Sequence, residues 1–464
     1  MKLSEAISLL ESGSIIRPGE RVLCALSGGA DSVALVDILH KAADKAGYEL
    51  CAAHVHHGIR MESDEEFEFV TGLCARMGIK LFTLKVNVPA IAQSTGESIE
   101  SAARRVRYDF FYSTARENKC DLIALAHHSR DQAETVLMHA LRGASVSGLT
   151  GMRQRAGMLV RPLLDVDPEE LREYIAQNGL EFREDATNSD THYTRNYVRH
   201  VILPTCEKAY PGSRSGLCRL ARAAARDDDF LSQITDEAAR KCLFDYPGGQ
   251  YICSEVFAGL HPAIQARIAA RAMRRTGNDP DQAGIERILD ALNGRNTNLT
   301  GDIRVSRGSN RIYLEYAGSG RGGRLMDALD ESNDVPNDDL PLHIENSLGS
   351  LIIERSVRDE NGKLPLGDGH WQQAIDLDAL RGTQLRFRRA GDMIWPLGAP
   401  GEKKLKDFYI DKKVDRQVRG FLPVLARGNR VIWALGVGAG RECAITQDSQ
   451  NTALMRWQGL KFWQ

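Results

Sequence analysis

The sequence predicts an α/β protein in which a doubly wound parallel sheet is followed by a helical middle subdomain and a mixed α/β C-terminal domain. Three observations lead to this prediction. Short apolar segments alternate with amphipathic ones up to about residue 200, apolar residues recur every three to four positions between 213 and 293, and residues 341–464 are rich in strand-like segments. At roughly 100–200 residues per domain, the 464 residues allow two to four domains.

The N-terminal part contains four short apolar segments that are typical of buried parallel strands. They occupy residues 21–26, 49–54, 81–86 and 121–126, and helical spacing follows them at 32–41, 62–77, 97–117 and 130–141. Repeated strand–helix units of this kind form a Rossmann-like sheet. Ligands of such sheets bind at the carboxyl ends of the strands, so the residues after each strand are the first candidates for a site.

The chain is expected to divide where its composition changes. The predicted parts are an α/β domain over 1–210, a helical middle subdomain over 211–317, a linker over 318–340 and a C-terminal region over 341–464. No strong strand is expected between 213 and 293, and a small hairpin is expected over 298–316. Four glycines and six acidic residues mark the linker. A helix is expected near 404–411 in the strand-rich C-terminal region.

Composition and cysteine usage indicate a cytoplasmic protein with no membrane partner. Hydrophobic residues make up 42% and charged residues 26% of the chain, so a core can form without disulfides or metals. The nine cysteines contain no C-x-x-C pair, which favours reduced thiols over a disulfide framework or a zinc knuckle. Residues 1–11 predict a short amphipathic helix rather than a signal peptide, and no apolar run approaches the ~20 residues of a membrane span.

Positive charge is concentrated in one C-terminal stretch. Residues 381–430 hold 13 lysines and arginines against five acids, a local net charge of +8 in a chain whose overall net charge is -2. Such a stretch is the usual electrostatic footprint of a partner with a phosphate backbone. Aromatic residues are interleaved with these charges, which suits RNA because rings stack on unpaired bases. They are Phe387, Trp395, Phe408 and Tyr409. The alternative is a solvated basic face.

A serine- and glycine-rich loop follows the first predicted strand and opens a helix. Its residues are Ser27, Gly28, Gly29, Ala30, Asp31 and Ser32. The glycines allow close backbone approach to a ligand, and a helix N-terminus offers free N–H groups and the positive end of its dipole. The loop is therefore expected to bind phosphates, and Asp31 to hold Mg²⁺ or a cationic group. It lacks the G-K-[ST] ending of a Walker A loop, which disfavours γ-phosphate transfer.

The S-G-G-x-D-S pattern after the first strand resembles the PP-loop ATP pyrophosphatase family. The resemblance implies ATP as co-substrate, attack on the α-phosphate, release of pyrophosphate and an adenylated intermediate. Members of this family include synthetases of GMP, NAD and argininosuccinate and several tRNA-modifying enzymes. The alternative for the loop is an ordinary glycine-rich turn with an Asp helix cap.

A second group of polar residues, 126–135, follows the fourth predicted strand. Asp131 and Glu134 are three residues apart, so they share one face of the expected helix and are placed to receive a cation together. His127 at the strand end is placed to stabilise charge on a phosphate. The alternative is a pair of acids that interact with the helix dipole beside a structural histidine.

This second group resembles the A-H-H-x-D-D-Q-x-E-T segment of the tRNA(Ile)-lysidine synthetases, which are PP-loop enzymes. Residues 52–60 resemble their second-strand segment, 103–108 their A-R-x-x-R-Y, and Asp185, Asn188 and 195–199 their D-x-x-N…R-N-x-x-R. The segments 389–392, 404–408 and 419–423 resemble their tRNA-binding tail. The resemblance covers nearly the whole chain and is strongest over residues 20–200.

The resemblance implies ATP-dependent ligation of free L-lysine to C2 of the wobble cytidine of isoleucine tRNA with a CAU anticodon. It implies catalytic roles for Asp31, His127, Asp131, Glu134 and Arg195, with Asp131 and Glu134 holding the lysine. Nucleotide contacts are implied for residues 27–32, Arg104 and Arg107, and substrate contacts for Asn196, Arg199, Arg389, Lys404, Lys406 and Arg419. The C-terminal region is expected to bind the tRNA, and a homodimer is considered as the assembly.

The sequence departs from this family at Arg130, where the family has the first Asp of its D-D pair. The second Asp of that pair remains, so the lysine site is expected to persist. His54, His56 and His57 are not expected to bind a metal. Strand alternation separates His57 from the other two, and no flanking cysteine or carboxylate completes a tetrahedral set. A loop near the nucleotide is expected there.

Three alternative functions stay open at this point. A tRNA thiolase of the same family would need a cysteine pair, and the chain has no C-x-x-C. A small-molecule amide synthetase would not need the basic C-terminal stretch. A nucleotide-sensing RNA-binding protein without catalysis would bind ATP but would not release pyrophosphate in response to lysine.

Overall fold

The structure is a computed structural model that describes residues 1–56, 58, 62–183, 194–295, 297–299, 303–316, 332–335, 340–357, 364–445, 449 and 451–459. The chain forms two compact units, Met1–Phe230 and Leu231–Gln464. The finer division predicted at residues 210, 317 and 340 stays a prediction. Within the described residues, no helix is long and apolar enough to cross a membrane.

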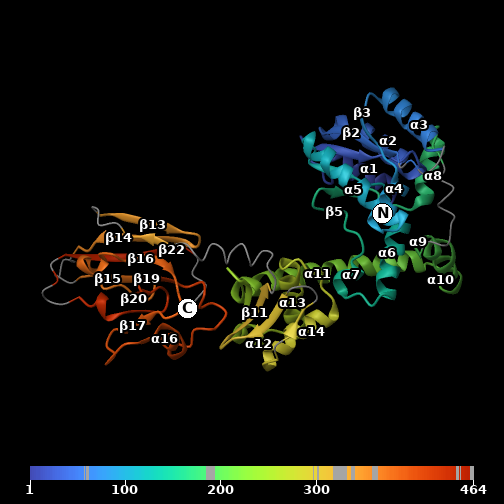
Figure 1. The fold of residues 1–464 in the computed structure, drawn as a ribbon. Coiled ribbons are helices and arrows are strands. Elements are labelled where there is room, and N and C mark those ends of the chain that lie inside the picture. Colours follow the sequence, from blue (N-terminus) through green and yellow to red (C-terminus); the bar gives the residue numbers. More distant parts are fainter. Residues whose placement is uncertain are drawn as a thin grey trace. The chain divides into compact units, whose positions relative to one another are not determined.

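The first unit is built on a six-stranded sheet with the order β3-β2-β1-β4-β6-β5. Its strands are β1 (Arg21–Ala25), β2 (Glu49–His56), β3 (Lys80–Lys85), β4 (Leu122–Ala124), β5 (Arg155–Ala156) and β6 (Leu159–Val160) (Figure 1). β1 pairs in parallel with β2 and β4, whereas the edge strand β5 is antiparallel to β6. The predicted doubly wound parallel sheet is confirmed, and the parallel strands β1, β2 and β4 present their carboxyl ends at one edge.

Helices cover both faces of this sheet. The helices that pack on it are α1 (Leu3–Glu11), α2 (Ala30–Ala46), α3 (Glu62–Met77), α5 (Ile99–Glu117) and α8 (Pro168–Gln177). The other helices are α4 (Val88–Thr95), α6 (Ser129–Leu141), α7 (Val146–Leu149), α9 (Thr194–Tyr197), α10 (Leu203–Ala209) and α11 (Ser213–Cys242), with a π-helix at Val198–Ile202. Val22 and Cys24 of β1 face a core that includes residues of α1, α2 and α8. Leu23 between them faces a second core with α5. This alternation is the period-two geometry of a strand buried on both sides.

The second unit begins with a five-stranded sheet and short helices. The strands are β7 (Leu243–Tyr246), β8 (Gly249–Cys253), β9 (Thr297–Asn298), β10 (Ile303–Arg307) and β11 (Arg311–Tyr316), and the helices are α12 (Ser254–Ala258), α13 (Pro262–Arg275) and α14 (Gln282–Asp290). β10 and β11 form the predicted hairpin. The expectation of no strong strand between 213 and 293 is wrong at β7 and β8. These short strands form because β8 pairs with the distant β11, which local sequence does not show.

The remainder of the second unit holds two further sheets. One contains β12 (Ser332–Asp334), β16 (Gln384–Phe387), β17 (Met393–Ile394), β18 (Lys403–Lys404), β19 (Pro423–Arg427), β20 (Arg430–Ala434) and β21 (Gly438–Ala439), and the other β13 (Leu342–Asn346), β14 (Gly349–Arg355), β15 (Gln372–Asp376) and β22 (Thr452–Gly459). The predicted helix near 404–411 is α16 (Leu405–Asp411). Part of the predicted linker, β12, pairs with β16. The rest of that segment lies largely outside the described residues.

Asp415 connects the β10–β11 turn to the C-terminal sheets. Its buried carboxylate accepts hydrogen bonds from the Tyr313 hydroxyl at 2.9 Å and from the Ser309 backbone N–H at 2.6 Å. Gly308 permits this approach, because a Cβ there would come within 2.4 Å of the carboxylate. The β10–β11 hairpin and the C-terminal sheets therefore share one hydrophobic core within the second unit.

Candidate active site

The loop between β1 and α2 is closed on itself by the Ser32 hydroxyl. This hydroxyl donates to the Gly29 carbonyl at 2.9 Å and accepts from the backbone N–H groups of Ser27 and Gly28, both at 3.2 Å. Gly28 has φ +93°, which favours glycine, and a Cβ there would lie 3.3 Å from Val70. The predicted phosphate loop is therefore a tight turn at the carboxyl end of β1.

The turn leaves backbone donors open at the N-terminus of α2. Gly29 is the N-cap residue, and the described residues provide no acceptor for the N–H groups of Ala30 and Asp31. A helix of 17 residues presents the positive end of its dipole at the same point. These open N–H groups and the Ser27 hydroxyl are suited to bind anionic oxygens, as the sequence predicts for the phosphates of a nucleotide.

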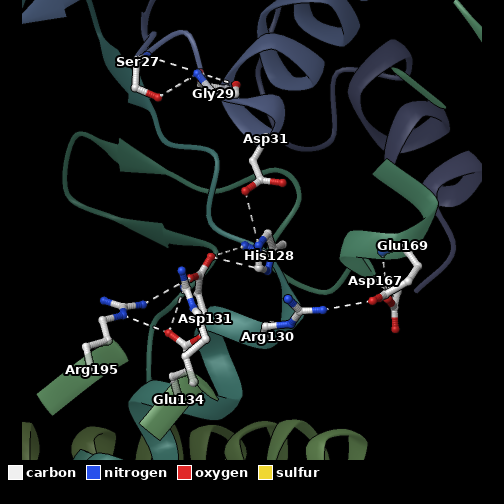
Figure 2. A network of polar contacts seen from close by, with 12 residues as sticks. Ser27, Gly29, Asp31, His128, Arg130, Asp131, Glu134, Asp167, Glu169 and Arg195 are labelled. Atoms are coloured by element: carbon white, nitrogen blue, oxygen red, sulfur yellow. Dashed lines mark hydrogen bonds and ion pairs between the residues drawn. The ribbon is translucent and has the colours of Figure 1, made fainter. Parts of the chain in front are cut away.

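His128 lies between two carboxylates, as Figure 2 shows. Its Nε2 is 3.5 Å from the Asp31 carboxylate, and its Nδ1 is 3.4 Å from that of Asp131. Burial alone lowers the pKa of His128, but the hydrogen bond to Asp31 and the charge of Asp131 outweigh burial and raise this pKa above its usual value. His128 therefore links the phosphate loop to α6 through contacts with both carboxylates.

Asp131 and Glu134 of α6 bind two arginines that follow residue 194 in the chain. Glu134 is fully buried, and its carboxylate accepts from Arg199 Nε at 2.6 Å and from Arg195 Nε at 2.9 Å. Asp131 Oδ1 accepts from Arg199 at 2.8 Å and from Arg195 at 3.3 Å. Arg195 lies in α9 and Arg199 in the π-helix that continues it, so one helical segment supplies both guanidinium groups.

These contacts bear on the predicted lysine site. The network contains three carboxylates and three cationic groups, so it carries no excess negative charge when the imidazole is protonated. Its members are Asp31, Asp131, Glu134, His128, Arg195 and Arg199. The expectation that Asp131 and Glu134 bind the ammonium group of lysine stays a prediction. It requires an arginine to give up a hydrogen bond, and the 3.3 Å contact from Arg195 to Asp131 is the longest between these carboxylates and the arginines.

His127 belongs to a neighbouring basic cluster. Its Nδ1 accepts a hydrogen bond from Arg161 at 3.3 Å, which places the proton of the neutral ring on Nε2. Burial and the charges of Arg161 and Arg195 lower the pKa of His127 to about 4. Burial and the nearby positive charge of Arg104 likewise lower the pKa of Arg107. No described carboxylate forms an ion pair with Arg104, Arg107 or Arg161, so this cluster is suited to bind an anion.

Arg130, the departure from the family pattern, points away from Glu134. Its Nη2 forms an ion pair with Glu169 at 2.9 Å, and Figure 2 shows it directed towards the Asp167–Glu169 start of α8. The guanidinium therefore ties α6 to α8. The Asp131–Glu134 network forms with an arginine at position 130.

The other candidates of the first unit lie near this network or outside the described part of the chain. Arg104 is exposed on α5 and stacks over the Tyr108 ring at 5.0 Å. Asn196 is half-buried in α9, next to Arg195. Asp185 and Asn188 are outside the described residues.

The histidines of β2 are buried and have protein partners. His54 Nδ1 lies 2.9 Å from the Leu26 carbonyl, and His56 Nε2 lies 3.1 Å from the Asp64 carboxylate. His57 is outside the described residues. Across the part of the chain that the structure describes, no group of three or more His, Cys, Asp or Glu side chains is placed to hold a metal ion by itself.

Sequence patterns alone assign no role to two residues of the site, His128 and Arg161. The signal for His128 was Asp131 three positions on, since the Asp131 carboxylate accepts from the His128 backbone N–H at 3.1 Å as at a helix cap. Arg161 follows β6, a strand of two residues that periodicity does not detect. Pairing of β6 with β4 brings Arg161 to the carboxyl edge of the sheet.

The basic C-terminal stretch is exposed only in part. Arg389, Lys404 and Lys406 are exposed, whereas Arg419 donates to the Val414 carbonyl at 2.9 and 2.7 Å. A further arginine of the stretch is a core residue: Arg386 is 1% exposed and bonds Asp392 at 2.9 and 2.8 Å. Removing this pair takes one charge of each sign from the stretch, so its excess of eight positive charges is unchanged.

The aromatic residues of this stretch mostly belong to the core. Phe387, Phe408 and Tyr409 are buried, so the expectation that they stack on bases is wrong for these three. Phe387 belongs to β16, Phe408 and Tyr409 belong to α16, and all three side chains pack in the hydrophobic core of the second unit. Trp395 is half-buried, and the Arg441 guanidinium lies 4.6 Å from its ring centre.

Comparison with known proteins identifies two domains. The family model of the PP-loop domain matches residues 3–206, and that of the TilS substrate C-terminal domain matches residues 383–457. The first match contains the phosphate loop, the Asp131–Glu134 network and both arginines. The second contains the exposed basic residues Arg389, Lys404 and Lys406.

Curated relatives align along nearly the whole chain. The tRNA(Ile)-lysidine synthase of Geobacter sulfurreducens is 34% identical over 459 residues, which covers 96% of this chain and 94% of the relative. The tRNA(Ile)-lysidine synthase of Clostridium perfringens is 30% identical over 468 residues, covering 98% and 99%. That of Clostridium acetobutylicum is 30% identical over 457 residues, covering 97% and 98%.

Proposed function

Because this chain belongs to the tRNA(Ile)-lysidine synthase family, we propose that it joins free L-lysine to C2 of the wobble cytidine of an isoleucine tRNA with a CAU anticodon. ATP drives the ligation and is split into AMP and pyrophosphate. The PP-loop match supports the use of ATP, and the C-terminal domain match supports a tRNA substrate. That the protein acts in the cytoplasm, and that it does so as a homodimer, are predictions.

One observation carries this proposal: a single network joins the phosphate loop to the paired carboxylates. It runs from Asp31 through His128 to Asp131 and Glu134, at the carboxyl ends of β1 and β4. The basic cluster around His127 lies beside it. An adenylating enzyme needs both parts, because it must bind a polyphosphate and place a nucleophile in line with the α-phosphorus.

In the first step, O2 of the cytidine attacks the α-phosphorus of ATP, the bond to the bridging oxygen breaks, and pyrophosphate leaves. The open N–H groups of Ala30 and Asp31 hold phosphate oxygens. His127 donates a hydrogen bond from Nε2, and Arg104 and Arg107 add positive charge where negative charge develops on the leaving pyrophosphate. The adenylated base is then electrophilic at C2.

In the second step, the amine of lysine attacks C2 and AMP leaves. Asp131 receives the ammonium group of lysine by exchange with Arg195, whose bond to Asp131 is longer than that of Arg199. The attacking amine must lose a proton before it forms the new bond. With a pKa of about 4, His127 is too weak a base for this task, so its role is hydrogen-bond donation.

The residues at the phosphate loop fit the requirements of Mg²⁺. In nucleotide sites this ion is held by one or two carboxylates together with phosphate oxygens and water. Asp31 supplies one carboxylate, 44% exposed, beside the open N–H groups of α2. When bound, the ion neutralises charge on the phosphates.

The test is incorporation of labelled lysine into an unmodified isoleucine tRNA with a CAU anticodon. The matched control is the same tRNA with uridine in place of the wobble cytidine. We expect incorporation that requires both ATP and the cytidine. Pyrophosphate release that depends on tRNA but leaves no lysine in it would point to another nucleophile, as in 2-thiolation. Pyrophosphate release that does not depend on tRNA would indicate a small-molecule synthetase.

A further inference from the structure

A pocket of about 490 Å³ lies beside the network, lined by residues of α6, the π-helix, α10 and the start of α11. Its volume falls within the ~300–1,000 Å³ that is typical of ligand sites. Arg199 belongs to its wall and also binds Glu134, so the pocket shares a residue with the candidate active site. Leu203 and Pro204 form an apolar part of the lining.

The polar part of the lining is mainly positive. Arg130, Arg199, Lys208 and Arg214 contribute four cationic groups against one carboxylate, that of Glu207. Arg199 is engaged with Asp131 and Glu134. Lys208 and Arg214 form no ion pair with any residue that the structure describes, so their charges are open to a ligand.

Glu207 faces the backbone of α11 rather than these cations. Its carboxylate accepts from the Gly212 N–H at 2.6 Å, from the Ser213 hydroxyl at 2.7 Å and from the Arg214 N–H at 3.1 Å. These hydrogen bonds hold the pKa of Glu207 below its usual value. The carboxylate therefore caps α11 and positions Arg214 at the pocket.

Arg130 completes the basic wall. Its partner Glu169 is 52% exposed, and an ion pair in such contact with water is weak and can exchange for a stronger partner. A hydrogen bond with Glu169 and, to a lesser extent, the positive charges of Arg214 and Arg130 hold the pKa of Asp167 at the start of α8 below its usual value.

We propose that this pocket binds one nucleotide of the RNA substrate, next to the base that is modified. The phosphate lies on Arg130, Lys208 and Arg214, and the sugar or base packs on Leu203 and Pro204. This inference rests on the proposed function. Cationic side chains beside an apolar wall suit a nucleotide in an unpaired loop. Contacts to the phosphate fix the position of the strand, and van der Waals contacts with the apolar wall hold the base.

The test measures the affinity of the full-length protein for unmodified CAU tRNA at several salt concentrations, without ATP or lysine. Lys208→Gln and Arg214→Gln should each raise Kd roughly five-fold at low salt and reduce the slope of log Kd against log salt by about 0.7. Arg17→Gln is the matched control, since Arg17 is exposed and precedes β1 at the opposite edge of the sheet. It should change neither quantity. Losses in the pocket variants no larger than in this control would overturn the proposal.

A conservative variant separates binding from a structural role. Arg214→Lys keeps the charge and should retain most of the affinity that Arg214→Gln loses. Equal losses in both variants, with a lowered thermal midpoint, would show that Arg214 only supports the start of α11 and would overturn the proposal.

Inorganic pyrophosphate distinguishes RNA phosphate from the phosphates of the nucleotide. Its inhibition constant and the KM for ATP should be the same in Arg130→Gln and the natural protein, while Kd for tRNA rises. A changed inhibition constant with unchanged tRNA affinity would assign the pocket to pyrophosphate instead. Binding is measured without lysine, so a failure of lysine incorporation and a failure of this inference give different results.

Discussion

Arg199 forms a bidentate pair with the fully buried carboxylate of Glu134, through Nε at 2.6 Å and Nη2 at 3.0 Å. A buried carboxylate keeps its charge only when it is paired and hydrogen-bonded. The pair fixes α6 against the π-helix, and it thereby sets the positions of Asp131 and Arg195. The geometry of the candidate active site depends on this contact.

Glu134→Gln keeps the shape of the side chain but leaves two guanidinium groups without their buried partner. We expect the free energy of unfolding of the first unit to fall by about 3 kcal/mol, as measured by urea denaturation. Lysine incorporation should fall by more than ~100-fold, because the arginines lose their position. Glu169→Gln breaks an exposed pair and should cost less than ~1 kcal/mol. Equal destabilisation by the two variants would contradict the role of Glu134.

The neighbouring histidines should titrate on opposite sides of the ordinary histidine pKa. We expect a pKa of about 4 for His127 and a raised pKa for His128, measured by NMR of histidine ring resonances. His128 then contributes stability that is fully present below pH ~6.5 and is lost as pH rises through its folded pKa. His127 contributes stability that is present above pH ~6.5 and is lost as pH falls towards 4. Two similar pKa values near 6.5 would contradict the described network.

Asp31→Asn should lower the pKa of His128, because it removes the hydrogen-bonded carboxylate that raises it. The pKa of His127 serves as the internal control, since burial and the charges of Asp131, Arg161 and Arg195 dominate its shift. The same variant should reduce adenylation by at least ~100-fold, because the phosphate loop loses its only carboxylate. Full activity in this variant would remove Asp31 from the site.

Asp131→Asn tests the exchange proposed for lysine. The neutral amide cannot pair with an ammonium group, so the KM for lysine should rise by about ten-fold or more while the KM for ATP changes little. Steady-state kinetics with each substrate varied in turn gives both values. A rise in the KM for ATP alone would place Asp131 at the nucleotide instead.

Arg386 and Arg389 provide a matched pair in the second unit. Arg386→Gln leaves the buried carboxylate of Asp392 without its partner, so the free energy of unfolding should fall by about 3–5 kcal/mol. Arg389 is exposed, and Arg389→Gln should weaken tRNA binding without lowering the melting temperature. Circular dichroism and tRNA binding at fixed salt measure the two effects. Loss of tRNA affinity without loss of stability in Arg386→Gln would contradict the buried pair.

Local sequence was sufficient for the first sheet and its site loops. The strands β1 to β4 and the helices α2, α3 and α5 were predicted because each segment has an apolar pattern of its own, whereas the short helix α4 was missed. The phosphate loop and Asp131–Glu134 were predicted because they follow strands whose carboxyl ends meet. The strands β7 and β8 were missed because they are short and form by pairing with the distant β11.

Burial and pairing were not predictable from residue types alone. Arg386 and Arg389 look alike in the sequence, yet only the guanidinium of Arg386 pairs with the buried carboxylate of Asp392, which lies in the turn after β16, whereas Arg389 contacts it through its backbone N–H. Asp131 and Glu134 were correctly placed on one helical face, but their pairing with Arg195 and Arg199 depends on a segment more than 60 residues away. The charged groups that a surface exposes can therefore be counted from the sequence only after its buried ion pairs are known.

Trapping of an adenylated tRNA tests the central claim most directly. The protein is incubated with unmodified CAU isoleucine tRNA and ATP labelled at the α-phosphate, in the absence of lysine. We predict that label joins the tRNA and that added lysine releases it as AMP while one lysine is joined for each AMP. Label that never joins the tRNA, although AMP and pyrophosphate form, would contradict the account, because the adenylate would then lie on another molecule.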